Sequence, residues 1–349
     1  MAYTSIDDPS EHFHSQLYTG TGSSHSVTND ANAGDFKPDW VWIKERSSSG
    51  GHKIYDSTRG VQQAIQSQST GAEVTTAQGL TAFNTDGFTV GSDGGHNQNN
   101  ATYVAWQWIA NGGTTASNTD GTITSTTQVN SDAGFSIQTF SSASSGNSNW
   151  GHGLGSTPDF FMVKRRNGTS SWWVNQTGMT RSGNNWQYIA LNADGQATTL
   201  SAFNADSSTI TSSNDFVPNS ATMLCYAFKN VQGFSKFGRY RGTGNLNGAF
   251  IYTGFKPAFV LFKQISGNGN GWFMFDTARN PINRSTNEYV RADESGAAGT
   301  TSKIIDMYSN GFKIINADSA VNGYNHTYIY MAFAENPFVT SGGVPTTAL

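Results

Sequence analysis

The chain is poor in charge, in cysteine and in long apolar runs. Asp, Glu, Lys and Arg make up only 13% of its 349 residues, whereas globular proteins carry about a quarter. The single cysteine, Cys225, cannot form an intrachain disulfide framework, so packing must supply the stability. Because Cys225 lies within an apolar run, we expect a buried small hydrophobe rather than a nucleophile. No stretch approaches the roughly 18 apolar residues of a membrane-spanning helix, so membrane insertion is not expected.

Excess charge of one sign and recognisable chemical motifs are also missing. The net charge is −4 and Lys and Arg form no cluster, which argues against a nucleic-acid partner. The N-terminus lacks the basic and apolar regions of a secretory signal. No phosphate-binding loop, nucleophile elbow or zinc-binding helix motif occurs, and the six glutamates contain no acid pair of the kind that glycosidases use. His12 and His14 lack a third metal ligand. We therefore predict no enzyme, no metal and no cofactor.

Turn-forming and strand-forming residues are abundant. Glycine accounts for 39 residues and aromatic residues for 13% of the chain, and Ser, Thr and Asn are frequent. No stretch of a dozen residues has a convincing helical periodicity. Many turn formers and β-formers with few charges are typical of an all-β protein with long polar loops. The composition therefore predicts antiparallel β-sandwiches, of a lectin-like or jelly-roll-like kind.

One short pattern, a proline followed six residues later by a lysine, occurs three times. Its copies are Pro38–Lys44, Pro158–Lys164 and Pro257–Lys263. Each contains four consecutive apolar residues, mostly aromatic or β-branched, which is typical of a strand buried on both faces. Proline is tolerated at the first residue of such a strand, where no ladder donor is lost. A repeat of this kind indicates that the chain folds as several copies of one structural unit.

Two further apolar blocks follow each copy of the pattern in the same order. Residues 54–56, 173–175 and 273–276 form the second block, and residues 102–108, 222–228 and 327–333 form the third. We predict three tandem β-sandwich units of roughly 100 residues each, with units two and three joined more rigidly than units one and two. The predicted boundaries are an N-terminal arm at 1–16, units at 17–112, 134–232 and 233–338, a Gly/Ser/Thr linker at 113–133, and a C-terminal tail at 339–349.

An Asp-x-x-Arg spacing follows the second block in the first and third units. Asp56 with Arg59, and Asp276 with Arg279, could each present a carboxylate and a guanidinium to a ligand, or could form an ion pair that fixes the loop. In the second unit the corresponding stretch, 175–178, has neither charge. Because acid and base disappear together, the structural ion pair is the favoured interpretation.

Several tryptophans lie close to polar, loop-like sequence. Exposed aromatic rings are the surfaces on which sugar rings stack, and the alternative is that these side chains fill the sandwich cores. The tryptophans near the polar stretches are the candidates for glycan contact: Trp150, Trp172, Trp186 and Trp272.

The repeated motifs resemble a family of tail-fibre-like structural proteins of marine bacteriophages, including cyanophages. The resemblance covers about residues 12–338 and rests on the Pro-x5-Lys strands together with five motifs. These are 151–155 (Gly-His-Gly-Leu-Gly), 233–238 (Gly-Phe-Ser-Lys-Phe-Gly), 252–257 (Tyr-Thr-Gly-Phe-Lys-Pro), 309–312 (Ser-Asn-Gly-Phe) and 332–338 (Ala-Phe-Ala-Glu-Asn-Pro-Phe). It implies concanavalin A-like lectin sandwiches and a virion component made in the bacterial cytoplasm. It does not imply sugar binding, because a fold does not fix a function.

We therefore expect a non-enzymatic virion protein, a tail fibre or similar adsorption component that presents loops to the host surface. Its expected partners are other virion proteins, docked through residues 1–16, further copies of itself in a homotrimer, and a host surface polysaccharide. Weak contacts repeated over units and subunits would give strong attachment. The alternatives are a capsid-attached fibre or cement protein without host contact, and a glycan depolymerase, which the missing acid pair disfavours.

Overall fold

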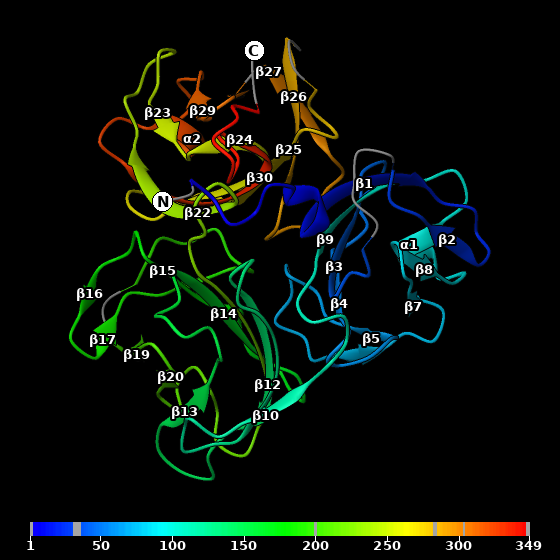
Figure 1. Cartoon of the computed structure of the whole chain (residues 1–349), viewed down its shortest axis with the longest axis vertical. Coiled ribbons are helices and arrows are strands. Elements are labelled where there is room, and N and C mark those ends of the chain that lie inside the picture. Colours follow the sequence, from blue (N-terminus) through cyan, green and yellow to red (C-terminus); the bar gives the residue numbers. More distant parts are fainter. Residues whose placement is uncertain (1–2, 31–35, 199–200, 282–284, 303, 347–349) are drawn as a thin grey trace.

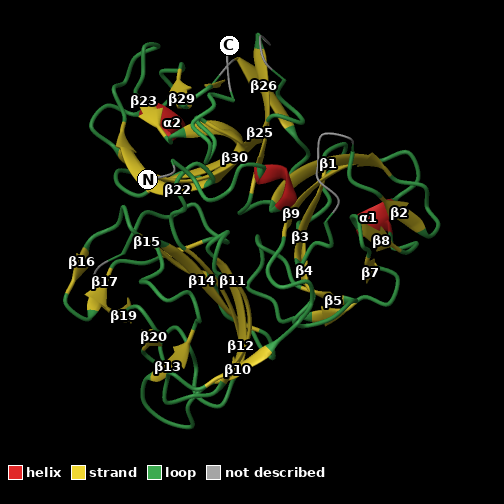
Figure 2. Cartoon of the chain, in the orientation of Figure 1, coloured by secondary structure: helices red, strands yellow, loops and turns green. Residues whose placement is uncertain are grey.

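The computed structural model describes residues 3–30, 36–198, 201–281, 285–302 and 304–346. Strands dominate, and all pairs of named strands are antiparallel, as the composition predicts. Figure 2 shows this all-β character directly. The helices of the described chain are single turns: η1 (Pro9–Glu11), α1 (Gly94–Asn97) and α2 (Ser319–Asn322).

The same order of four strands recurs in three main sheets. In the first it is β1-β9-β3-β4, in the second β12-β21-β14-β15, and in the third β22-β30-β24-β25. The Pro-x5-Lys runs supply β3, β14 and β24, which lie inside their sheets and are buried on both faces. We call residues 13–108, 116–228 and 235–337 repeats 1, 2 and 3. The four strands are β1 (Phe13–Thr19), β9 (Thr102–Trp108), β3 (Trp40–Glu45) and β4 (Lys53–Asp56) in repeat 1, β12 (Phe135–Ser141), β21 (Thr222–Phe228), β14 (Phe160–Arg165) and β15 (Trp173–Gln176) in repeat 2, and β22 (Ser235–Arg241), β30 (Thr327–Pro337), β24 (Phe255–Gln264) and β25 (Trp272–Asp276) in repeat 3.

Each main sheet faces a smaller outer sheet, which makes a sandwich. The outer sheets are ordered β2-β8-β7, β13-β20-β19-β17-β16 and β23-β29-β28. Separate apolar cores fill the sandwiches of repeats 1 and 2. The outer strands are β2 (His25–Val27), β8 (Phe88–Val90), β7 (Leu80–Phe83), β13 (Ser148–Gly151), β20 (Thr209–Ser212), β19 (Ser201–Ala205), β17 (Asn185–Trp186), β16 (Arg181–Ser182), β23 (Phe250–Tyr252), β29 (Gly311–Ile314) and β28 (Ile305–Tyr308).

The three main sheets also pack against one another around a common core. Figure 1 shows the repeats as three lobes whose main sheets face the middle of the molecule. Trp40 of repeat 1 lies 4.7 Å from Tyr226 of repeat 2, ring centroid to centroid. Phe228 of repeat 2 lies 5.7 Å from Phe333 of repeat 3, and Phe259 of repeat 3 lies 5.7 Å from Trp106 of repeat 1. The repeats therefore form a closed ring, and we call their contacts seams 1/2, 2/3 and 3/1.

The segment predicted as a linker, 113–133, contributes two strands to the second main sheet. It contains β10 (Ala116–Asn118) and β11 (Ser125–Asn130), and β11 pairs with β12 along its whole length. Threonine and valine favour strands, and here that preference prevails over the linker-like composition. The prediction that 113–133 is a linker is therefore wrong where β10 and β11 lie. The remaining strands are β5 (Gln63–Ala64), β6 (Val74–Thr75), β18 (Ile189–Ala190), β26 (Thr286–Arg291) and β27 (Gly299–Ser302).

The predicted arm at 1–16 is not a free extension over its described residues. Thr4 and Ile6 are buried, and the Thr4 hydroxyl donates to the carbonyl of Gln232 at 2.8 Å. Strand β1 begins at Phe13, four residues before the predicted start of the first unit. This segment therefore belongs to the folded body, and its first described residue, Tyr3, donates to the carbonyl of Gly254 in repeat 3 at 2.7 Å.

Candidate binding surface

The lysines that close the Pro-x5-Lys runs are buried at the seams. Lys164 Nζ donates to the carbonyl of Thr70 at 2.9 Å, Lys263 to that of Asp194 at 2.7 Å, and Lys44 to that of Ser295 at 3.2 Å, and each acceptor lies in a neighbouring repeat. Burial lowers the pKa of each lysine to about 8. A buried amine is tolerated when hydrogen bonds replace its water, so these lysines have a structural role in ring closure.

Two of the tryptophans assigned to glycan contact occupy one equivalent seam position. Trp172 and Trp272 are fully buried. Their indole N–H groups donate across seams 1/2 and 2/3 to the carbonyls of Gln66 and Ala190, at 2.8 and 2.9 Å. In repeat 1 the position is held by His52, whose Nε2 lies 2.9 Å from the carbonyl of Arg291 across seam 3/1. The assignment of these tryptophans to glycan contact is therefore wrong.

The other two tryptophans are also enclosed. Trp150 is fully buried and stacks on Phe140 with the ring centroids 4.4 Å apart, in the sandwich core of repeat 2. Trp186 is 7% exposed and the guanidinium of Arg181 covers its ring at 4.0 Å. Neither presents an open face on which a sugar could stack. Polar neighbours in the sequence made all four tryptophans resemble loop residues, but large apolar rings gain most from burial.

The Asp-x-x-Arg spacings do form ion pairs, and each pair reaches into the next repeat. Asp56 contacts Arg59 and accepts from the hydroxyl of Tyr226 at 2.6 Å. Asp276 contacts Arg279 at 2.7 Å and accepts from the indole of Trp106 at 3.0 Å. Tyr226 and Trp106 occupy equivalent places in their sheets, opposite Met162 and Trp42.

Repeat 2 lacks this ion pair because its neighbour offers no side-chain donor. The strand register aligns Gln176, rather than Asn175, with Asp56 and Asp276. The equivalent of Trp106 in repeat 3 is Met331, which has no N–H or O–H group. Gln176 instead donates to the carbonyls of Gly238 and Tyr330, at 2.9 and 3.1 Å. The charged residues of this motif are thus explained by the seams and need no ligand.

The described residues contain no metal centre and no helix that could cross a membrane. No group of three or more His, Cys, Asp or Glu side chains among them could hold a metal ion. None of the described helices is long and apolar enough to span a bilayer.

Large apolar side chains are exposed mainly on repeat 3. Eight such side chains of the described chain are exposed, and five of them lie between residues 246 and 324. Exposed apolar groups that gather on one face mark binding surfaces, whereas isolated ones need no explanation. The five are Leu246, Phe250, Tyr252, Tyr308 and Tyr324.

Three of these aromatic side chains form a platform on the outer face of the outer sheet. Phe250 and Tyr252 of β23 are 46% and 55% exposed, and Tyr308 of β28 is 37% exposed. Gly311 of the middle strand β29 pairs with Tyr252 on one side and with Tyr308 on the other. The tyrosines therefore stand two strand spacings apart, roughly 10 Å, with a glycine between them. The rings of Phe250 and Tyr308 are 5.9 Å apart in an edge-on arrangement.

The equivalent faces of the other repeats carry no aromatic side chains at these positions. The register aligns Phe250 and Tyr252 with Ser26 and Thr28 of repeat 1, and with Gly151 and Gly153 of repeat 2. In repeat 1 the Asn84 amide donates to Ser26 at 3.1 Å, which makes that face polar. The platform, defined as Phe250, Tyr252 and Tyr308, is thus a feature of repeat 3 that the fold itself does not require. No pattern in the sequence distinguishes these three residues from ordinary strand aromatics.

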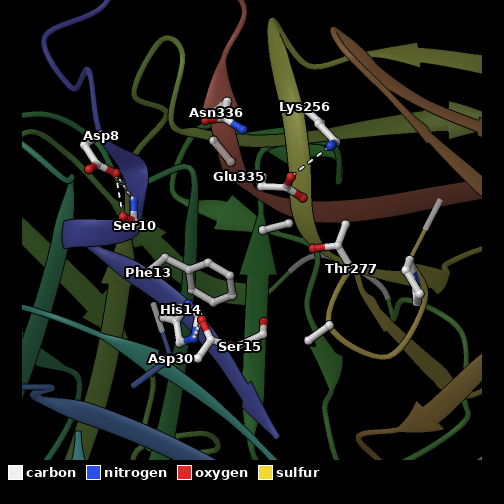
Figure 3. A pocket seen from close by; sticks show the side chains of 14 residues that line it. Asp8, Ser10, Phe13, His14, Ser15, Asp30, Lys256, Thr277, Glu335 and Asn336 are labelled. Atoms are coloured by element: carbon white, nitrogen blue, oxygen red, sulfur yellow. Dashed lines mark hydrogen bonds and ion pairs between the residues drawn. The ribbon is translucent and has the colours of Figure 1, made fainter. Parts of the chain in front are cut away.

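A cavity of about 630 Å³ opens at seam 3/1. Figure 3 shows its two walls, one from η1 and β1 with Phe13, His14 and Ser15, and the other from β24 and β30 with Lys256 and Glu335. Lys256 and Glu335 form an ion pair at 2.8 Å. Burial lowers the pKa of His14, so this wall presents a neutral imidazole near pH 7. No pair of acids with matched roles is apparent in the lining.

Comparison with known proteins identifies the family but no function. Residues 8–337 match the family described as a domain of unknown function, DUF7483, and because this match spans nearly the whole chain, the chain belongs to that family. None of the curated proteins and none of the solved structures compared with the chain matches it.

Proposed function

We propose that this member of the family is a non-enzymatic adsorption protein of a bacteriophage particle, which binds a host surface polysaccharide through the platform of repeat 3. The observation that carries the proposal is the exposed row Tyr252, Gly311 and Tyr308, with Phe250 beside it. The resemblance to tail-fibre-like proteins supports the virion as its location. The ion pairs and buried lysines of the seams are engaged in closing the ring, and we assign no catalytic set among the described residues.

The dimensions and chemistry of the platform favour an unbranched, uncharged glycan. Two tyrosine rings separated by roughly 10 Å match the length of two linked sugar rings. The C–H faces of pyranoses stack on aromatic rings, and the tyrosine hydroxyls can hydrogen-bond with ring substituents. The ring of Phe250 lies over Gly311, with its Cζ 3.0 Å from where a Cβ at that glycine would stand, so a chain of sugars that spans the two tyrosines would lie across Phe250 as well.

A single platform of this size binds weakly, and its strength must come from repetition. Each chain has one platform, because repeats 1 and 2 carry Ser26 and Gly151 in place of Phe250. Several chains held together in a homo-oligomer, for which we propose a trimer, raise the effective concentration of the remaining sites once one has bound. The closed ring provides a rigid base for such a site.

The experiment compares the wild type with a triple variant, Phe250→Thr, Tyr252→Thr and Tyr308→Thr. Threonine keeps the strand preference of these positions, and repeat 1 already carries Thr28 at one of them. Retardation in native gels that contain a soluble polysaccharide would be measured over a panel of unbranched neutral and anionic polymers. We expect retardation by at least one neutral polymer, and a loss of about tenfold or more in affinity for the triple variant, roughly 1.4 kcal/mol.

Tyr324→Thr is the matched control, because Tyr324 is 73% exposed but lies outside the outer sheet. It should keep the wild-type retardation. Binding that survives in the triple variant would move the contact away from the platform. Failure of the wild type to bind any polysaccharide of the panel or intact bacterial cells would contradict the adsorption role and favour a cement protein without host contact. Release of reducing sugar would instead indicate a depolymerase.

A further inference from the structure

The cavity at seam 3/1 exists because small residues stand where the other repeats have large or polar ones. Ser15 of β1 corresponds to Ile137 and Phe237, both of which are buried in the common core. On the opposite wall, Ala258 corresponds to Asp39 and Asp159. Ser15 is only 7% exposed, and its hydroxyl has no hydrogen-bond partner among the described residues. A buried hydroxyl without a partner costs free energy unless something binds to it.

At seam 1/2 the equivalent space is filled by a strand. Strand β11 pairs with β12 there and places Gln128 opposite Ile137, the counterpart of Ser15. The Gln128 amide is fully buried and donates to the hydroxyls of Ser57 and Thr58, each at 2.8 Å. The counterparts of these two residues in repeat 3 are Thr277 and Ala278, and both line the cavity.

At seam 2/3 no additional strand is needed. Phe237 of β22 is buried at the position equivalent to Ser15. Gly178 stands where repeat 1 has Thr58, and a side chain there would meet Arg239 and the carbonyl of Gly238 of β22 at about 3 Å. The two walls therefore meet directly. Seam 3/1 thus has neither the large residue of seam 2/3 nor the inserted strand of seam 1/2.

Strand β1 presents a suitable edge to this cavity. It is the outer strand of its sheet as far as the structure describes it, whereas the equivalent β12 is covered by β11. Ile109 donates its backbone N–H to the carbonyl of His12 on the inner side of β1, so the alternation of an antiparallel ladder turns the N–H and C=O groups of Phe13 and Ser15 outward. Phe13, His14 and Ser15 all line the cavity, which therefore runs along the strand edge (Figure 3).

We propose that this groove binds an extended polypeptide segment of a partner protein, which adds to the edge of β1 as β11 adds to β12. The segment carries a glutamine opposite Ser15, whose amide enters the cavity and hydrogen-bonds with the hydroxyls of Ser15 and Thr277. Main-chain hydrogen bonds give such an added strand its affinity, and the pocketed side chain gives its specificity. The site is independent of the platform, and it gives the protein a second attachment point, suited to docking on another protein of the same particle.

The test uses the full chain and a synthetic peptide of residues 123–131, Ile-Thr-Ser-Thr-Thr-Gln-Val-Asn-Ser, which reproduces β11. Fluorescence anisotropy of the labelled peptide should show saturable binding to the wild type. A peptide with leucine in place of its glutamine should bind at least tenfold more weakly. Ser15→Ile, which installs the residue of repeat 2, should fill the cavity and abolish binding, while its thermal unfolding shows that the fold is intact. Tyr324→Thr should bind as the wild type does.

Amide hydrogen exchange places the bound peptide. Binding at β1 should slow the exchange of the Phe13 and Ser15 amides and leave those of β12 unchanged. Binding that persists in Ser15→Ile, or protection confined to β12, would show that the peptide merely exchanges with β11 in repeat 2, and would overturn the proposal. Absence of binding at peptide concentrations up to the millimolar range would overturn it as well. Neither result bears on the platform, because the polysaccharide experiment is read separately.

Discussion

At the residue scale, the seams show how one position can serve the same purpose with different side chains. Trp172, Trp272 and His52 each place a ring nitrogen against a carbonyl of the neighbouring repeat. The histidine differs from the tryptophans in a way that matters, because it can take up a second proton. Its Nδ1 accepts from the indole of Trp42 at 2.8 Å, so the neutral form with the proton on Nε2 satisfies both contacts.

This arrangement predicts a loss of stability in mild acid. Burial, with a further contribution from Lys44, lowers the pKa of His52 to about 3. Between pH 3 and 6.5 the unfolded chain therefore binds a proton that the folded chain does not, so stability falls as the pH falls through this window. His52 alone should contribute about 2 kcal/mol to the decrease in unfolding free energy between pH 7 and pH 5.

The comparison variant replaces Trp42 and His52 with the residues that repeat 2 has at these two positions, as the double substitution Trp42→Met, His52→Trp. That combination exists naturally as Met162 with Trp172, so it should fit the seam. Urea unfolding at pH 7 and pH 5 should show a smaller pH dependence for the double variant than for the wild type. Burial also lowers the pKa of His12, His14, His96 and His152, so part of the dependence should remain. If the double variant showed the same pH dependence of unfolding free energy as the wild type, His52 would have to be protonated in the folded protein.

At the element scale, the N-terminal residues comprise a segment before η1 that packs on the folded body and the strand β1. Truncation should distinguish what each contributes to stability. Deleting residues 1–7 removes the buried Ile6 and the Thr4 hydrogen bond, at a cost of about 2–3 kcal/mol. Deleting residues 1–16 also removes Phe13, whose ring lies 4.9 Å from Trp108 and 5.3 Å from Phe333 in the common core. We expect the first protein to be folded and less stable, and the second to be insoluble or unfolded.

Soluble yield and chemical unfolding would measure both truncations. Full stability after the deletion of 1–16 would show that the segment is a free arm, as the sequence analysis predicted. The difference arises because the first strand of repeat 1 lacks the Gly-Phe opening of the other repeats at 134–135 and 233–234. Without that marker, alternation alone did not fix where β1 begins.

An element could be predicted from the sequence where its own residues carry a distinctive pattern. The apolar runs of β3, β14 and β24 have the composition of strands buried on both faces, and the structure buries them so. Strand β11 was not predicted, because its polar Ser, Thr and Gln residues are also common in linkers. The platform was not predicted either, because Phe250 and Tyr252 are aromatic residues of the kind that strands usually bury. Aligning them with Ser26 and Thr28 is what shows them to be unusual.

At the scale of the whole molecule, the sequence indicated the repeat but not its closure. The same local pattern is compatible with a row of separate sandwiches and with a ring, because both bury the same strands. The distinction lies in long-range contacts, such as that of Trp40 with Tyr226 and those of the buried lysines with carbonyls of neighbouring repeats. One clue was present in the sequence. Trp172, Trp272 and His52 follow the lysines of their repeats at nearly the same distance, and a shared position of this kind suggests packing rather than ligand binding.

The central claim is that the three repeats share one core and fold as one body, and scanning calorimetry of the wild type and Trp172→Ala tests it most directly. We predict one transition whose calorimetric enthalpy is about equal to its van't Hoff enthalpy. Truncating the buried Trp172 should destabilise the protein by about 3–5 kcal/mol and shift that transition as a whole. A calorimetric enthalpy about three times the van't Hoff value, or a variant in which only about a third of the heat moves to lower temperature, would contradict the ring and indicate three independent sandwiches.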